Sequence, residues 1–175
     1  AVRAADVDEE GLLRPPLSEG VQALARAKAE CVAALDPGAL VIGADTIVTL
    51  GDCAMGKPKD AADARQMLRT LSGRRHSVLT GVAVVWQGRA LTACEETFVT
   101  FAPLSADLID AYVATGEPLD KAGAYGIQGR ASVCIEKIDG CYFNVVGLPL
   151  FRLGQLLQEA GIEPWRLWDS STCQD

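Results

Sequence analysis

Histidine and closely spaced cysteines are scarce in this 175-residue chain, and their scarcity excludes several kinds of site. His76 is the only histidine, and no two cysteines form a CxxC pair. We therefore expect neither a zinc site nor a disulfide framework, and we interpret His76 as structural because no nucleophile partner is evident. The cysteines are expected to be reduced thiols that pack as small hydrophobic side chains: Cys31, Cys53, Cys94, Cys134, Cys141 and Cys173.

Positive charge and long apolar runs are also in short supply. The chain has 16 lysines and arginines against 23 acidic residues, which gives a formal net charge of -7. This balance opposes broad electrostatic attachment to nucleic acid or to an anionic membrane. No apolar run approaches the roughly 18 residues that a membrane-spanning helix needs. We therefore expect a cytoplasmic protein with no nucleic-acid or membrane partner, in which local cations meet any bound phosphate.

Hydrophobic residues make up 49% of the sequence and charged residues 22%, which suits one globular domain with a sizeable core. We predict a single domain over residues 1–175, with a polar tail from about residue 166. Helical and extended patterns alternate, and they predict an α/β fold with a mixed twisted sheet and flanking helices. The expected helices cover residues 18–35, 60–72, 105–115 and 149–160, and the expected strands cover residues 39–50, 76–86, 89–101, 131–138 and 141–147.

Three lysines stand out by their local context. Lys28 falls on the apolar stripe of the first expected helix, where a lysine either lays its stem on the surface or points its amine into a cleft. Lys57 precedes Pro58, which holds it in extended geometry on a short rigid turn. Lys121 lies in the loop GEPLDKAGAYGIQG, residues 116–129, where the simpler interpretation pairs it with a surface carboxylate.

The remaining candidates are carboxylates and one amide. Asp45 interrupts the apolar strand ALVIGADTIVTL, residues 39–50, where a buried carboxylate must be paired, protonated or bound to metal. The simpler alternative is a strand-end aspartate that caps a turn. Asp120 and Gln128 lie in the glycine-rich loop, and the Gln128 amide can recognise a base edge. Separate lysines, with carboxylates that hold Mg²⁺, would let an acidic protein bind a polyphosphate.

Five sequence blocks occur in a characteristic order: VIGADTIV, GKPKD, LSGRRHSVLTGVAV, GEPLDKAGAYGIQG and KIDGCYFNVVGLPL. From Asp6 to Leu157 the chain resembles the Maf-like nucleotide pyrophosphatases, once described as septum-formation inhibitors. The resemblance implies an inosine-triphosphatase-like fold with two lobes around a cleft. It also implies hydrolysis of a nucleoside triphosphate to its monophosphate and pyrophosphate, with Mg²⁺ as cofactor and Mn²⁺ as an alternative. The loop form AGAYGIQG resembles the branch that acts on dTTP and UTP, not the 7-methyl-GTP branch.

The same resemblance implies roles for individual residues. Asp45 matches the catalytic aspartate, either as general base or as metal ligand. The residues that match phosphate-facing lysines are Lys28, Lys57 and Lys121. The residues that match positions of substrate choice are Thr46 and Gln128. The expected metal ligands are Asp45, Asp120 and Glu9.

Members of the family begin with a strand and a phosphate-binding loop rich in serine, proline and arginine, whereas this sequence opens at AVRAADVDEE. We expect the record of the chain to be incomplete at this end, because a missing first strand would leave the sheet with an unpaired neighbour. Two other functions stay open: a house-cleaning pyrophosphatase for modified nucleotides, and a non-catalytic nucleotide-binding regulator of division. A homodimer also stays open.

Overall fold

The computed structural model describes residues 1–168, without the side chains of residues 9, 10, 167 and 168. Within this range the chain forms a five-stranded sheet of order β2-β1-β3-β4-β5. The strands are β1 (Val41–Leu50), β2 (Cys53–Met55), β3 (Arg75–Trp86), β4 (Arg89–Phe101) and β5 (Ile135–Asp139). The predicted α/β fold with flanking helices is confirmed, but the neighbouring strands are all antiparallel and the sheet is not mixed. Strands β2 and β3 lie on opposite sides of β1, so they form no parallel pair.

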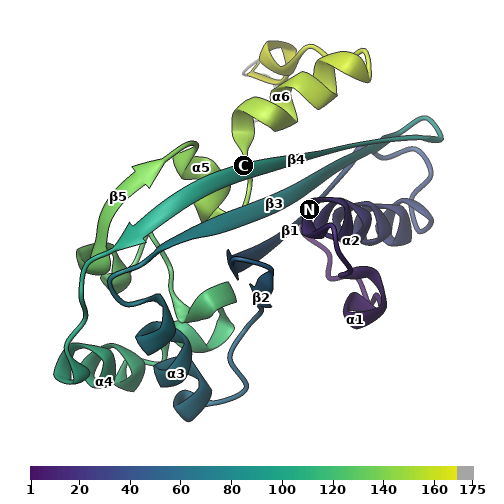
Figure 1. The fold of residues 1–175 in the computed structure, drawn as a ribbon. Coiled ribbons are helices and arrows are strands. Elements are labelled where there is room, and N and C mark those ends of the chain that lie inside the picture. The colour runs from purple at the N-terminus through teal and green to yellow at the C-terminus, as the bar shows by residue number, and fades with distance from the viewer. Residues whose placement is uncertain (169–175) are drawn as a thin grey trace.

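Strands β3 and β4 form a long hairpin at the centre of the fold (Figure 1). They are joined at the predicted turn of Gln87 and Gly88, where φ is 50° and 75°. Two consecutive residues with positive φ suit the twist of a tight hairpin. Most of β3 is buried, because helices pack against both of its faces.

Helix α2 (Leu17–Ala33) packs on one face of β1 and β3, after the short helix α1 (Glu9–Leu12). Two glycines allow its close approach. A Cβ atom at Gly43 would collide with the backbone carbonyl oxygen of Ala25, and one at Gly81 would collide with that of Val21. The face of the sheet that carries these glycines is therefore shaped for the backbone of α2.

A second group of helices packs at the other end of the sheet (Figure 1). Helix α3 (Ala61–Leu71) begins at the predicted cap Asp60, and α4 (Ala106–Ala114) begins at the predicted cap Ser105. Each cap side chain accepts hydrogen bonds from backbone N–H groups of the first helical turn, which otherwise lack partners. These helices share one core with the sheet, which includes Leu68, Leu71, Val99, Phe101 and Ile109.

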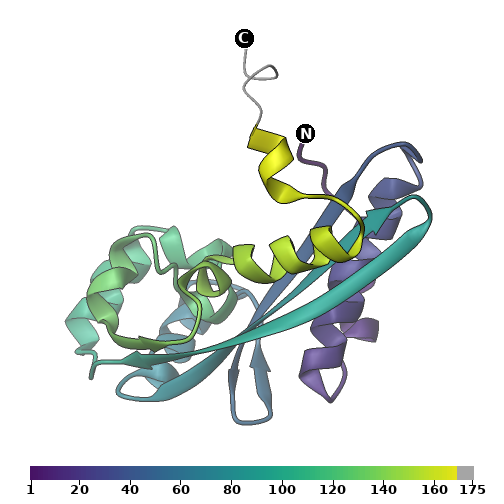
Figure 2. The ribbon, with the colours of Figure 1, turned by 90° about the horizontal axis from the view of Figure 1, so that it is seen from above.

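Helices α5 (Tyr142–Val146) and α6 (Leu150–Glu159) cover the face of the sheet opposite α2. Leucines of α6 pack on Val82 and Val84 of β3, and Figure 2 shows α6 beside the β3–β4 hairpin. The short 3₁₀ helices are η1 (Glu117–Asp120), η2 (Ala122–Ala124), η3 (Arg130–Cys134) and η4 (Pro164–Trp168). Among the described helices, none combines the length and the apolar character needed to cross a membrane.

Four local predictions are wrong in whole or in part. The first half of the expected strand 131–138 belongs to η3, and only its second half is extended, as β5. The expected strand 141–147 is instead α5, because Asn144 turns inward and is fully buried there with hydrogen bonds to the sheet. Helix α2 starts one residue before the predicted cap Ser18 and ends at Ala33, which leaves Leu35 exposed. The first residues of the predicted polar tail, 166–168, belong to η4, and its remainder, which includes Cys173, lies outside the described residues.

Candidate active site

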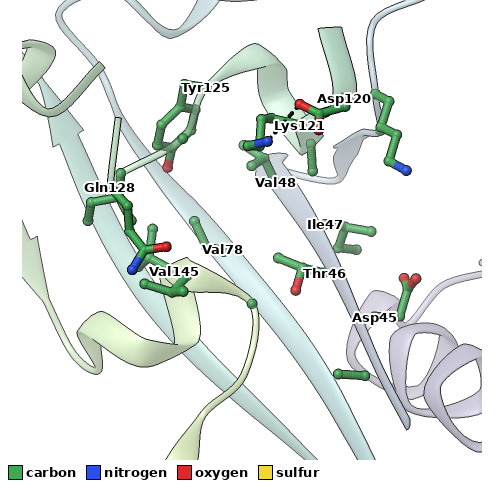
Figure 3. A pocket seen from close by; sticks show the side chains of 18 of the residues that line it. Asp45, Thr46, Ile47, Val48, Val78, Asp120, Lys121, Tyr125, Gln128 and Val145 are labelled. Atoms are coloured by element: carbon green, nitrogen blue, oxygen red, sulfur yellow. Dashed lines mark hydrogen bonds and ion pairs between the residues drawn. The ribbon is translucent and has the colours of Figure 1, made fainter. Parts of the chain in front are cut away.

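A cavity of about 640 Å³ lies between α2 and the loop of residues 117–129, with β1 along its wall (Figure 3). This volume suits a small-molecule ligand. The described side chains predicted from the sequence all line it: Lys28, Asp45, Thr46, Lys57, Asp120, Lys121 and Gln128. The side chain of Glu9, the remaining predicted metal ligand, lies outside the described residues.

Asp45 and Lys28 form an ion pair on the α2 side of the cavity. Alternation along β1 turns Asp45 toward α2, where the Lys28 ammonium donates a hydrogen bond to Oδ1 at 2.5 Å. The two side chains are 14% and 23% exposed, so solvent screens the pair only partly. Lys28 therefore points its amine into a cleft, and Asp45 is a paired carboxylate and not a turn cap.

A second charged group lies at the opposite side of the cavity. Lys121 donates a hydrogen bond of 2.6 Å to the neighbouring Asp120 carboxylate. This hydrogen bond, with a smaller contribution from the charge of Lys57, holds the pKa of Asp120 below its usual value. Among the side chains that the structure describes, the exposed Lys57 ammonium has no carboxylate within ion-pair distance, so its charge is available to an anionic ligand.

The glycine-rich loop is held by a carboxylate that the sequence did not single out. Glu117 accepts a hydrogen bond from the Tyr112 hydroxyl at 3.0 Å and another from the backbone N–H of Arg130 at 3.0 Å. The backbone N–H of Gly126 in turn donates to the Tyr112 oxygen. Burial raises the pKa of Tyr112, so its hydroxyl stays protonated and can donate. A Cβ atom at Gly129 would collide with the Glu117 carboxylate and displace it from these hydrogen bonds.

Gln128 extends from this braced loop and is exposed to the cavity. Apolar groups line the cavity near this loop, among them Val78, Tyr125, Ile127 and Val145. The buried His76 orients Tyr125, because its Nε2 lies within hydrogen-bond distance, 2.9 Å, of the Tyr125 hydroxyl. Burial lowers the pKa of His76 to about 4, so the imidazole is neutral near pH 7 and acts as a structural group.

Thr46 occupies the middle of the cavity between Gln128 and Asp45 in Figure 3. Thr46 lies opposite Thr80 of β3 in the paired strands, and the hydroxyl oxygens of the two threonines lie 2.9 Å apart. Thr80 is fully buried, and its hydroxyl donates a hydrogen bond of 3.0 Å to the backbone carbonyl of Asn144 on α5. The Asn144 amide nitrogen then donates to the hydroxyl of Thr97 on β4. Thr46 is therefore tied to a buried polar chain that crosses the sheet.

The available ligand atoms fit a divalent cation that the protein shares with its ligand. Mg²⁺ takes oxygen ligands, and proteins supply one or two carboxylates while phosphates and water supply the rest. Asp45 and Asp120 offer such carboxylates at two places on the cavity wall. No group of three or more metal-binding side chains occurs within the described part of the chain. A single carboxylate at either place thus suits a cation that is held together with phosphate oxygens and water.

Sequence reasoning missed Glu117, Thr80 and Asn144. Glu117 lies inside the glycine-rich block, but nothing in the block shows that its carboxylate turns back to the loop. Thr80 and Asn144 gain their meaning from the β1–β3 register and from α5, and the sequence had predicted a strand in place of α5.

Comparison with known proteins places these observations in a family. The family model described as Maf-like protein matches residues 1–160. A Symbiobacterium thermophilum protein named dTTP/UTP pyrophosphatase is 54% identical over 160 residues, which cover 91% of this chain and 82% of that protein. Proteins with the same name from Bacillus pumilus and Moorella thermoacetica are 51% identical over 148 residues and 50% identical over 166 residues. These matches cover 85% and 94% of this chain, and 78% and 86% of the two relatives.

Proposed function

The chain belongs to the Maf-like protein family, and from this membership we propose that it hydrolyses dTTP and UTP to the nucleoside monophosphate and pyrophosphate. The observation that carries the proposal is the composition of one cavity. It gathers three lysines in a protein of net charge -7, together with the carboxylates of Asp45 and Asp120 and the neutral amide of Gln128. Local cations of this kind allow an acidic protein to bind a polyphosphate.

The charged groups suggest how the triphosphate is held and cleaved. Lys57 and Lys121 would bind phosphate oxygens from one side of the cavity, and Lys28 from the other. Asp45 would accept a proton from a water molecule that attacks the α-phosphorus. The bond from the α-phosphorus to the oxygen shared with the β-phosphorus breaks, and pyrophosphate leaves with that oxygen. The lysines would neutralise the charge that develops on the phosphate oxygens.

We further propose that Mg²⁺ is the cofactor and that one carboxylate, Asp45 or Asp120, is its protein ligand, because the two lie at opposite sides of the cavity. When bound, the cation would neutralise phosphate charge and lower the pKa of a coordinated water. Gln128 would bind the base, since its amide N–H group can donate a hydrogen bond to a base carbonyl oxygen. The proposed setting is the cytoplasm, where the enzyme would remove unwanted nucleotides from the pool.

A hydrolysis screen tests the proposal directly. The full-length protein would be incubated with Mg²⁺ and with dTTP, UTP, CTP, purine triphosphates or 7-methyl-GTP, and pyrophosphate would be resolved from orthophosphate. We expect pyrophosphate to be released fastest from dTTP and UTP. Faster turnover of modified nucleotides would favour the house-cleaning alternative. Thermal stabilisation by nucleotides without any turnover would favour a binding protein and would contradict the proposal.

A further inference from the structure

The polar chain behind Thr46 fixes the direction of its hydrogen bonds. A hydroxyl group has one proton, so it can donate only one hydrogen bond. Thr80 uses its proton on the backbone carbonyl of Asn144, which accepts at 3.0 Å and has no proton to give. If Thr80 donated to Thr46 instead, its oxygen would face that carbonyl oxygen at 3.0 Å with no proton between them.

The hydrogen bond between Thr46 and Thr80 can therefore have only one donor. Their oxygens lie 2.9 Å apart, and the proton of Thr80 is already used, so Thr46 must be the donor. This consumes the only hydroxyl proton of Thr46. What Thr46 presents to the cavity is then a hydrogen-bond acceptor that cannot act as a donor.

We propose, on the basis of the uracil and thymine nucleotide specificity proposed above, that Thr80 is a positioning residue that makes Thr46 an obligatory acceptor for the N3–H group of the base. Uracil and thymine both carry this N–H group between two carbonyls. Cytosine carries an unprotonated, accepting nitrogen at the same position. Because Thr46 cannot donate, a lone pair of its oxygen would face the lone pair of the cytosine nitrogen with no proton between them. Such a buried polar contact without a hydrogen bond lowers the affinity for cytosine.

Removal of the Thr80 hydroxyl would free the proton of Thr46. In Thr80→Val the Thr46 hydroxyl can rotate and donate to cytosine, so the preference for UTP over CTP should fall about tenfold, as for one hydrogen bond. Thr80→Ser keeps the hydroxyl and should restore the preference, and Thr80→Ala provides a second test if the valine variant does not fold. The measured quantity is the ratio of kcat/KM for UTP to that for CTP.

Thr97→Val is the matched control. Thr97 belongs to the same buried chain and is fully buried, but it bonds to Asn144 and to the backbone of Cys141, not to Thr80. Its variant should lose stability while it keeps the UTP preference. An unchanged ratio in Thr80→Val, or an equal fall in Thr97→Val, would overturn the proposal, because the effect would then be absent or merely due to a loosened α5.

Binding separates this proposal from the proposed hydrolysis. The dissociation constants of the α,β-methylene analogues of UTP and CTP would be measured by calorimetry for wild type and for the same variants. Suppose that wild type binds the uridine analogue more tightly than the cytidine analogue, that Thr80→Val weakens this preference, and that wild type releases no pyrophosphate. This result would contradict hydrolysis and still support the role of Thr80. Equal binding of both analogues by wild type would overturn the role of Thr80.

Discussion

Lys28 of α2 and Asp45 of β1 stand 17 positions apart in the sequence and form one ion pair at the wall of the cavity. The pair forms because Gly43 and Gly81 let α2 approach the sheet closely. A close-packed helix therefore delivers a cation to the carboxylate that the proposed reaction uses as proton acceptor.

The Asp45→Asn variant tests that carboxylate. An amide neither accepts the proton of water as a base nor binds Mg²⁺ as a charged ligand, so we expect kcat for dTTP to fall by about 10² to 10⁴. Asp36→Asn, which changes an exposed aspartate outside the cavity, should leave kcat unchanged. Near-normal turnover by Asp45→Asn would remove this residue from the mechanism. A higher Mg²⁺ requirement in the variant would identify Asp45 as a ligand, whereas a lower rate at an unchanged requirement would identify it as the base.

Lys57 and Lys59 form a matched pair of lysines. Both are exposed and lie two residues apart, but only Lys57 lines the cavity. We expect Lys57→Ala to lower kcat/KM for dTTP by about 10² through loss of a charge near the phosphates. Lys59→Ala should change it little. Equal effects of the two substitutions in steady-state assays would show that Lys57 acts only through the general surface charge.

The Gln128→Glu variant tests recognition of the base. A carboxylate cannot donate to a base carbonyl, so kcat/KM for UTP and dTTP should fall about tenfold relative to the purine triphosphates. Gln155→Glu introduces the same charge on α6, outside the cavity, and serves as control. An unchanged nucleotide preference in competition assays would show that Gln128 does not contact the base.

Local patterns predicted most of this architecture because they act over short distances. The caps Asp60 and Ser105, the Gln87-Gly88 turn and the strand around Asp45 were all predicted, since each depends on neighbouring residues. Helix α5 was not predicted, because its apolar and aromatic sequence also suits a strand. What selects the helix is the burial of Asn144 against β3 and β4, and that contact joins residues 66 and 47 positions apart.

The candidate site likewise combines features that local sequence predicted with contacts that it could not predict. The seven described residues chosen from sequence line one cavity, but their pairings could not be predicted. Lys28 and Asp45 meet only because α2 crosses β1, and Thr46 and Thr80 meet only through strand register. Sequence therefore predicted which side chains line the cavity, while the contacts that orient them required the fold.

The hydrogen bonds that Glu117 makes beneath the glycine-rich loop predict that a substitution at Gly129 lowers stability. Gly129→Ala would push a methyl group into the Glu117 carboxylate, so we expect stability to fall by about 1–3 kcal/mol and kcat/KM to fall with it. Gly38→Ala, where a Cβ atom meets nothing within 4 Å, is the control. In a double-mutant cycle, Gly129→Ala should cost less when Glu117 is already alanine. Additive losses in chemical denaturation would show that the two residues are not coupled.

His76 predicts how stability depends on pH. Its side chain is 2% exposed, and burial lowers its pKa from 6.5 to about 4. The unfolded chain therefore binds a proton near pH 6.5 that the folded protein excludes down to about pH 4. The stability contribution of the neutral imidazole is complete above pH 6.5 and is lost as the pH falls toward 4, by about 3 kcal/mol in total.

Two measurements check this dependence. His76→Gln retains a polar group near the Tyr125 hydroxyl but does not titrate, so the difference in unfolding free energy between wild type and variant should shrink by about 3 kcal/mol from pH 7 to pH 4. Carboxylates titrate in both proteins and largely cancel in that difference. Because His76 is the only histidine, its imidazole resonance can be followed by NMR without ambiguity. A titration midpoint near 6.5 in the folded protein would show that the imidazole becomes charged without a burial penalty, and the predicted loss of stability would then not occur.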